Sequence, residues 1–235
     1  MSIDLEFSRF ANSYETYGII QKNVTKHLLS LVDFQPKKIL DLGCGSGNVY
    51  KMLSWDIEHF VGIDFAKNML ELHPKAKNVE CIYGDFENPE LYEYLLSYTF
   101  DIVLSSSALQ WACDLDRVMR NVATLQTPVA FAIFGANTFK TLHQVANISS
   151  PLREVSEVET IVKRYFDLHH TEVQNYTLSF ESNLEALRYI KRSGVSGKRG
   201  VLSYKETKKL IAEYPLSYLE FEVLYIKATP KNAIG

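Results

Sequence analysis

The sequence of residues 39–47 is Ile39-Leu40-Asp41-Leu42-Gly43-Cys44-Gly45-Ser46-Gly47, and a second apolar stretch, Val61-Gly62-Ile63-Asp64, follows about twenty residues later. The first stretch predicts a buried strand that runs into a glycine-rich turn, with a helix beginning near Ser46. Glycines at alternate positions leave the backbone amides open to a ligand, and the first N–H groups of the helix point at the same place. In a doubly wound sheet, an acid at the end of the next strand, here Asp64, lies over the hydroxyls of a ribose. The pattern therefore predicts a nucleotide-like ligand.

The carboxylate of Asp41 narrows the class of ligand. Dinucleotide sites usually carry G-x-G-x-x-G, because a pyrophosphate lies on the helix N-terminus. Here the spacing is G-x-G-x-G and Asp41 lies in the strand before it, where a carboxylate would repel a phosphate but suits an ammonium and a sulfonium group. This pattern resembles motif I of class I S-adenosylmethionine-dependent methyltransferases. The alternative is a generic α/β turn in which the aspartate is fortuitous.

Two further segments occur where that resemblance implies them. Residues 79–86 form a third, mostly apolar stretch that ends in Asp85 and Phe86. Residues 100–107 form a fourth, which begins with Phe100 and Asp101 and continues into a loop of serines. The resemblance implies that Asp85 accepts a hydrogen bond from the adenine amino group, that Phe86 packs against the ring, and that the serine loop lies beside the methyl group. From the residues alone, Asp85 could be a solvated turn residue, and Asp101 is expected to cap a strand. The cofactor-binding residues that we predict are Tyr14, Gln21, Asp41, Gly43, Cys44, Gly45, Asp64, Phe65, Met69, Asp85, Phe86, Ser105 and Ser106.

Length and composition agree with one enzyme-sized domain of 235 residues. The net charge of −3 gives no general attraction to nucleic acid, and no apolar run approaches the ~20 residues that span a membrane. The acidic N-terminus lacks the basic region and apolar core of a signal peptide. The three cysteines, Cys44, Cys81 and Cys113, are far apart in core-like strands or loops. We therefore expect reduced thiols in a cytoplasmic protein, and no zinc or other metal site.

Strand and helix patterns alternate along the chain, which favours a mostly parallel sheet. The helices that we expect lie at residues 15–33, 182–192 and 203–213, and the strands lie near residues 37–42, 59–63, 79–83, 100–104, 127–134, 170–180 and 218–226. The resemblance implies the α/β fold of class I methyltransferases, a Rossmann-like, doubly wound, seven-stranded sheet with the last strand antiparallel. It also implies an N-terminal helical lid over residues 1–33 and a helical insertion over residues 182–213. We expect residues 1–235 to form a single methyltransferase domain.

Segments outside the cofactor motifs narrow the resemblance to one family. These segments are Phe7-Ser8-Arg9-Phe10-Ala11 with Tyr14-Glu15 and Gln21, Ser105-x-x-Ala108-x-Gln110-Trp111, Phe131 through Thr141-Leu142-His143-Gln144, Arg188-x-x-Lys191-x-x-Gly194, and Tyr214-Pro215-Leu216-Ser217-Tyr218. Over nearly the whole chain they resemble the malonyl-acyl-carrier-protein O-methyltransferases of biotin synthesis, the BioC family. Two positions depart from the family pattern: Leu125-Gln126-Thr127-Pro128 replaces the usual Arg-Pro-Gly-Gly turn, and Ser106 stands where an asparagine is common.

The resemblance implies transfer of a methyl group from the sulfonium of S-adenosylmethionine to the free carboxylate of a malonyl thioester, with S-adenosylhomocysteine as product. A carboxylate is already ionised at pH 7, so no catalytic general base is required, and the site must supply alignment and exclusion of water. The substrate-binding residues that we predict are Lys191, which we expect to hold the carboxylate, Arg188, Trp111, Tyr17 and His143. The alternatives are a solvated helix face for Lys191 and Arg188, a core position for Trp111 and a structural role for His143.

Residues 191–200 carry four cations in a glycine-rich segment of an otherwise acidic chain. Acyl carrier proteins are acidic, so a surface that docks one should be basic. We therefore predict carrier docking by Arg192, Lys198 and Arg199. The alternative is a loop made soluble by its charge.

Other functions remain open for the same fold. A small-molecule carboxyl or quinone-type carbon methyltransferase would share the core, and a methyltransferase-fold assembly factor would bind partners without methylating them. The intact Asp41, Gly45, Asp64 and Asp85 argue against the assembly factor. Nucleic-acid methylation is disfavoured, because no Asn-Pro-Pro-Tyr or Asp-Pro-Pro-Tyr follows the fourth strand and the net charge is negative. A carrier protein and coenzyme A are alternative carriers of the malonyl group.

Overall fold

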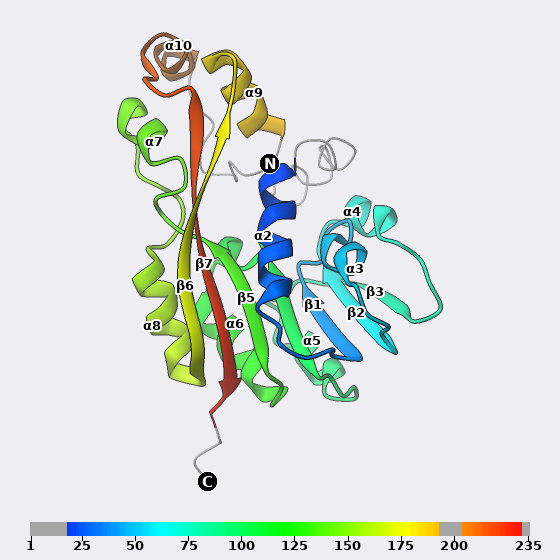
Figure 1. Ribbon diagram of the computed structural model, residues 1–235. Helices are drawn as coiled ribbons and strands as arrows, with labels where there is room; N and C mark the ends of the chain where they lie inside the picture. Colours follow the sequence, from blue (N-terminus) through cyan, green and yellow to red (C-terminus); the bar gives the residue numbers. More distant parts are fainter. Residues whose placement is uncertain (1–17, 193–203, 232–235) are drawn as a thin grey trace.

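The computed structural model describes residues 18–192 and 204–231. Its strands are β1 (Lys38–Leu42), β2 (His59–Asp64), β3 (Val79–Tyr83), β4 (Ile102–Ser106), β5 (Val129–Phe134), β6 (Phe166–Ser179) and β7 (Tyr218–Pro230). Within the described residues they form a seven-stranded sheet in the order β3-β2-β1-β4-β5-β7-β6 (Figure 1). Strands β1 to β5 run parallel, whereas β7 is antiparallel to both of its neighbours. The predicted doubly wound sheet with an antiparallel last strand is confirmed.

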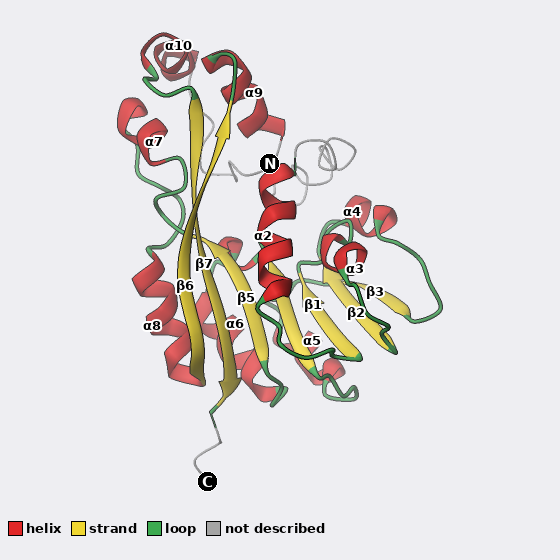
Figure 2. Ribbon diagram, in the orientation of Figure 1, coloured by secondary structure: helices red, strands yellow, loops and turns green. Residues whose placement is uncertain are grey.

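Helices cover both faces of this sheet (Figure 2). They are α2 (Ile19–Ser30), α3 (Asn48–Met52), α4 (Lys67–Leu72), α5 (Pro89–Leu95), the 3₁₀ helix η1 (Leu109–Trp111), α6 (Leu115–Thr124), α7 (Lys140–Ala146), α8 (Val155–Tyr165), α9 (Asn183–Arg192) and α10 (Tyr204–Glu213). Ile39 of β1 belongs to one core cluster with α2, and the next residue, Leu40, belongs to a second with α5, α6 and α8. Successive side chains of a strand point to opposite faces, so the apolar run of β1 is buried on both sides.

The insertion between β6 and β7 lies at the far end of their long hairpin (Figure 1), where α10 contacts both α7 and α9. Pairing of the two strands continues to Ser179 and Tyr218, immediately before and after this region. Tyr189 of α9 meets the ring of Phe221 of β7, with the ring centroids 6.4 Å apart, and Phe139 meets the same ring at 5.1 Å. The ring of Phe221 therefore connects α9 to Phe139, the residue immediately before α7.

Two boundaries differ from the sequence-based expectations. The helix after the glycine turn begins at Asn48 rather than near Ser46, because Gly47 has the left-handed φ of +85° and cannot belong to the helix. Strand β6 begins at Phe166 rather than near residue 170, because its pairing with β7 continues past a bulge to Pro230. The helix expected at residues 15–33 is described from Ile19 onward.

The cysteines do not all lie where the sequence predicted them. Cys44 is buried, but Cys81 and Cys113 are exposed, so the expectation of core-like positions is wrong for these two. All three thiols are free. Among the described helices, none is long and apolar enough to cross a membrane.

Candidate functional site

A pocket opens at the carboxyl ends of β1, β2 and β4. Its empty volume is about 570 Å³, counting space open to solvent. Strand β1 lies between β2 and β4, so this is the switch point at which open α/β sheets bind their ligands. The pocket is lined by Gly43, Cys44, Gly45, Ser46, Asn48, Asp64, Phe65, Met69, Phe86, Ser106, Ser107, Ala108 and Trp111.

The glycine turn forms the floor of this pocket and requires its glycines. Gly43 and Gly45 have φ angles of +74° and +53°, in the left-handed region that favours glycine. A Cβ atom on Gly43 would lie 2.2 Å from the Cβ of Ala108, in the segment that follows β4. The amides of Gly43 and Cys44 both donate to the carbonyl of Ile63, at 2.8 and 2.9 Å. The turn is therefore fixed between the ends of β2 and β4.

The carboxylate of Asp64 closes the turn at the end of β2. Its Oδ2 accepts a hydrogen bond from the amide of Gly45 and its Oδ1 accepts one from the amide of Ala66, both at 2.8 Å. Asp64 lines the pocket although only 8% of its surface is exposed. A carboxylate held in this way presents a fixed acceptor to hydroxyl groups of a ligand.

The carboxylate of Asp41 is buried without a partner. The residue is 1% exposed, and neither carboxylate oxygen has a hydrogen-bond partner among the described residues. Burial, with a smaller contribution from the charge of Asp64, raises the pKa of Asp41 to about 8. Gln21 of α2 is 3% exposed, and its Oε1 also lacks a partner there. Burying a hydrogen-bond acceptor without a partner costs free energy of folding. The side chains of Asp41 and Gln21 therefore suit a ligand that brings cationic or hydrogen-bond-donating groups.

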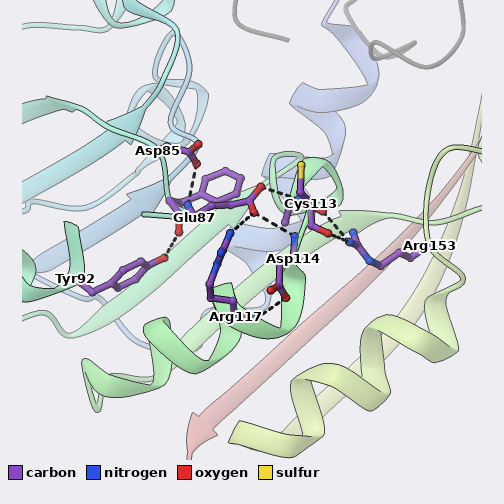
Figure 3. A network of polar contacts seen from close by, with 9 residues as sticks. Asp85, Glu87, Tyr92, Cys113, Asp114, Arg117 and Arg153 are labelled. Atoms are coloured by element: carbon purple, nitrogen blue, oxygen red, sulfur yellow. Dashed lines mark hydrogen bonds and ion pairs between the residues drawn. The ribbon is translucent and has the colours of Figure 1, made fainter. Parts of the chain in front are cut away.

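The wall formed by Phe86 is connected to the segment after β4 through Glu87 (Figure 3). The Glu87 carboxylate accepts hydrogen bonds from the amides of Cys113, at 2.7 Å, and Asp114, at 3.2 Å. It also accepts one from Nη2 of Arg117 at 3.1 Å. Phe86 is 5% exposed and Trp111 lies two residues before Cys113, so Glu87 joins the two segments that carry aromatic walls of the pocket.

Replacing Glu87 by alanine should lower the free energy of unfolding by about 1–3 kcal/mol, because three donors lose a largely buried acceptor. Urea denaturation measures this change. The matched control is Glu93→Ala, since Glu93 is exposed on the neighbouring helix α5 and its side chain has no hydrogen bond or ion pair within the described part of the chain. Equal denaturation midpoints for the two variants would contradict the connecting role of Glu87.

The structure brings most of the predicted cofactor residues together. Those that line the pocket are Gly43, Cys44, Gly45, Asp64, Phe65, Met69, Phe86 and Ser106. Ser105 lies beneath it and donates from Oγ to the carbonyl of Leu42 at 2.8 Å. Asp85 is exposed and does not line the pocket; its Oδ1 accepts from the amide of Glu87 at 2.8 Å. Tyr14 lies outside the described residues.

The predicted substrate residues are less concentrated. Trp111 lines the pocket, whereas Arg188 is exposed on α9. Lys191 and Arg192 belong to the last turn of α9, and Tyr17, Lys198 and Arg199 lie outside the described residues. His143 lies in a second pocket beside α7.

Sequence reasoning missed Thr25. Its Oγ1 donates to the carbonyl of Gln21 at 2.9 Å and shares a hydrogen bond of 2.8 Å with Oγ of Ser106, at the end of β4. The two residues of α2 are four positions apart, so they lie on one face of the helix, and this spacing was the available signal. Ser46, Asn48, Ser107 and Ala108 also line the pocket, although they were not among the cofactor-binding residues that we predicted. Within the described ranges, no group of three His, Cys, Asp or Glu side chains could hold a metal ion.

Comparisons with known proteins agree with this geometry. A family model described as a methyltransferase domain matches residues 39–128. The malonyl-[acyl-carrier protein] O-methyltransferase of Haemophilus influenzae is 30% identical over 203 residues, which cover 81% of this chain and 75% of that protein. The protein of the same name from Bacillus anthracis is 30% identical over 170 residues, which cover 68% of this chain and 62% of that protein. A solved SAM-dependent methyltransferase from Anabaena variabilis superposes with a TM-score of 0.62 at 12% identity, covering 98% of this chain and 96% of the other.

The sheet order, the glycine-turn pocket and the matching family model define an S-adenosylmethionine-dependent methyltransferase of class I. Within that class, the chain belongs to the malonyl-[acyl-carrier protein] O-methyltransferase family.

Proposed function

We propose that this protein transfers the methyl group of S-adenosylmethionine to the free carboxylate of the malonyl group on an acidic acyl carrier protein, an early step of biotin synthesis. The observation that carries the proposal is the glycine-turn pocket of a chain of this family, which is lined by the buried carboxylate of Asp64 and follows the buried carboxylate of Asp41 in β1. The free thiols of the three cysteines support a cytoplasmic location.

The residues present fit S-adenosylmethionine, which supplies an electrophilic methyl group on a sulfonium. The orphaned carboxylate of Asp41 suits the positive charge of this compound, and Asp64 suits the two ribose hydroxyls. Phe86 and Met69 offer apolar surface to the adenine ring. Asp85 is two residues past β3, so a contact between its carboxylate and the adenine amino group stays a prediction.

The acceptor side of the reaction needs position rather than proton transfer. A malonyl carboxylate is ionised at pH 7, and the protein has to hold it in line with the methyl group and exclude water, which is worth roughly 7–11 kcal/mol in well-aligned reactions. Trp111 supplies a wall beside the turn. We keep Lys191, with Arg188 second, as the predicted partner of the carboxylate, and Arg192, Lys198 and Arg199 as predicted contacts to the carrier. The lid, including Tyr14 and Tyr17, and the single domain over residues 1–235 also stay predictions.

Binding of S-adenosylmethionine should release a proton from Asp41 at pH 6–7. Folding raises the pKa of this carboxyl from 3.8 to about 8, so its contribution to stability is present below pH 4 and is lost as the pH rises through about 8. A bound cation favours the ionised form and lowers that pKa. Release should therefore approach one proton per site near pH 6 and vanish above about pH 9. Titration calorimetry in buffers of different ionisation enthalpy measures the number of protons.

The control for this experiment is Asp41→Asn, which keeps the size of the side chain and removes its titration. The amino group of the ligand titrates near pH 8 itself, and the variant isolates that contribution. Equal proton release by the variant and the unchanged protein would contradict the role of Asp41.

The proposed reaction is tested with methyl-labelled S-adenosylmethionine and four acceptors: malonyl-acyl carrier protein, malonyl-coenzyme A, free malonate and acetyl-acyl carrier protein. A base-labile methyl ester on the malonyl carrier, and none on the acetyl carrier, is the expected result. Methylation of free malonate alone would favour the small-molecule alternative. Binding of S-adenosylmethionine without transfer to any acceptor would favour the non-catalytic assembly factor.

A further inference from the structure

A second pocket lies between α7 and the segment that leads to α8. Its empty volume is about 620 Å³, including space open to solvent. The residues that line it are Ala136, Lys140, His143, Gln144, Asn147, Ile148, Ser149 and Ser150. Six of these eight side chains are polar, and none is acidic. The first pocket differs in carrying the large apolar walls Phe65, Met69, Phe86 and Trp111.

Several polar groups of the second pocket have no partner in the protein. Lys140 is exposed, and its ammonium forms no ion pair or hydrogen bond with the residues that the structure describes. The Nδ1 atom of His143 is buried and has no hydrogen-bond partner among the same residues. Burial also lowers the pKa of His143, so its ring is neutral at pH 7 and offers one donor and one acceptor. The hydroxyl oxygen of Ser150 accepts from the amide of Leu152 at 3.3 Å, which leaves its proton for donation.

Two carboxylates of β7 accept hydrogen bonds from residues on either side of Lys140 and are therefore already engaged. Glu220 accepts from the amide of Thr141 at 2.9 Å. Glu222 accepts from the side-chain amide of Asn137 at 2.7 Å and from its backbone amide at 3.1 Å. The second pocket therefore combines one cation, hydroxyl donors and carboxamides, which is the chemistry that recognises a phosphate with adjacent amide groups.

Hydrogen bonds connect residues 106–113, which border the first pocket, to chain segments next to the second pocket. Ser106, Ser107, Ala108 and Trp111 line the first pocket. The wall of the second pocket formed by Ser149 and Ser150 is followed by Arg153, whose Nη2 donates to the carbonyls of Ala112 at 2.8 Å and Cys113 at 2.9 Å. In addition, the amide of Ser107 donates to the carbonyl of Ala132 at 2.9 Å, four residues before Ala136. Residues 106–113 are therefore connected to the surroundings of both pockets, and an elongated ligand that occupied both pockets would run beside this segment.

We propose that the second pocket binds the phosphate-bearing end of the phosphopantetheine arm that carries the malonyl group. This inference rests on the proposed function, because that function makes a thioester of such an arm the substrate. The arm has a reactive thioester at one end, a phosphate at the other and two amides between them. With the malonyl end beside the glycine turn, the phosphate meets Lys140 and the hydroxyl of Ser150, and the amides of the arm lie beside the carboxamides of Gln144 and Asn147.

The experiment compares malonyl-phosphopantetheine with malonyl-pantetheine, which lacks the phosphate. The wild-type protein should have a lower KM for malonyl-phosphopantetheine than for malonyl-pantetheine. Lys140→Ala should raise that KM about tenfold, the loss expected for one charge-assisted hydrogen bond, and should leave the KM for malonyl-pantetheine within twofold. The matched control is Lys163→Ala, since Lys163 is exposed on α8, away from the second pocket, and pairs only with Glu159 among the described residues; both KM values should stay unchanged.

A second measurement separates this inference from the proposed reaction. Titration calorimetry with phosphopantetheine alone should detect binding that Lys140→Ala weakens about tenfold and that Lys163→Ala leaves intact. Phosphopantetheine binding of this kind without methylation of any malonyl thioester would overturn the proposed reaction and support the site. Methylation with equal KM values for the two substrates, or with both raised equally by Lys140→Ala, would overturn the phosphate site and leave the reaction standing. Normal folding of each variant is checked by its circular dichroism and thermal unfolding.

Discussion

Replacing Asp64 by alanine should weaken the binding of S-adenosylmethionine by about 10- to 100-fold, because charge-assisted hydrogen bonds of this kind contribute about 1.5–3 kcal/mol. The proposed bonds to the ribose are lost in this variant. The amides of Gly45 and Ala66 also lose the acceptors that fix the glycine turn. Titration calorimetry with the unchanged protein and the variant measures the difference in Kd.

Two further variants separate the contributions of Asp64. Asp64→Asn keeps the size of the side chain and one acceptor oxygen, so it should lose less affinity than Asp64→Ala. Asp56→Ala is the matched control, since Asp56 is exposed before the start of β2, at the opposite end of that strand. We would abandon the ribose assignment if Asp64→Ala bound S-adenosylmethionine as tightly as the control does.

The central strands could be predicted closely because burial determines their composition. Parallel strands covered on both faces are nearly continuous apolar runs, and β1 begins at Lys38, within one residue of the expected start. The expected cap also appears: Oδ2 of Asp101 accepts from the amides of Lys37 at 2.7 Å and Lys38 at 2.9 Å. The glycines and acidic residues that follow these strands in the sequence then predicted the first pocket. The carboxyl ends of neighbouring parallel strands meet at one edge of the sheet, so residues at those ends are brought together in space.

The connections between distant segments could not be predicted from local patterns. Glu87 binds the amide of Cys113, 26 residues away, and Arg153 binds the carbonyl of Ala112, 41 residues away. No spacing rule encodes such pairs, since they depend on the order of the strands and on the paths of the loops. The second pocket is local by contrast, because its lining residues all lie within residues 136–150, in and around α7. Sequence reasoning selected His143 from that pocket but left Lys140 and Ser150 unassigned.

Helix α8 was not among the helices that we expected from the sequence, although its apolar pattern is present there. Val158, Ile161 and Val162 are buried at the spacing of one helical face. They belong to the same core cluster as Phe166, the first residue of β6. Recognising this helix at residues 155–165 would have moved the expected start of β6 from near residue 170 to its observed position.

Replacing Gly43 by alanine should destabilise the fold by about 2 kcal/mol or more and should also weaken S-adenosylmethionine binding. The left-handed φ of +74° costs an alanine about 1–2 kcal/mol. The new methyl group would also lie 2.2 Å from the Cβ of Ala108, so the turn or the segment after β4 has to move. Both line the first pocket. Urea denaturation and titration calorimetry on the same samples measure the two effects.

The double variant Gly43→Ala with Ala108→Gly separates the two causes. It removes the colliding methyl group and keeps the backbone strain, so it should recover the part of the lost stability that comes from the collision. Gly84→Ala is the matched control, because Gly84 has no positive φ and an added Cβ would meet its nearest neighbour, Cδ1 of Leu91, only at 3.5 Å. If Gly43→Ala were as stable as Gly84→Ala and bound S-adenosylmethionine normally, the turn would not require glycine at this position. If the double variant were no more stable than Gly43→Ala alone, backbone strain rather than the contact with Ala108 would account for the requirement.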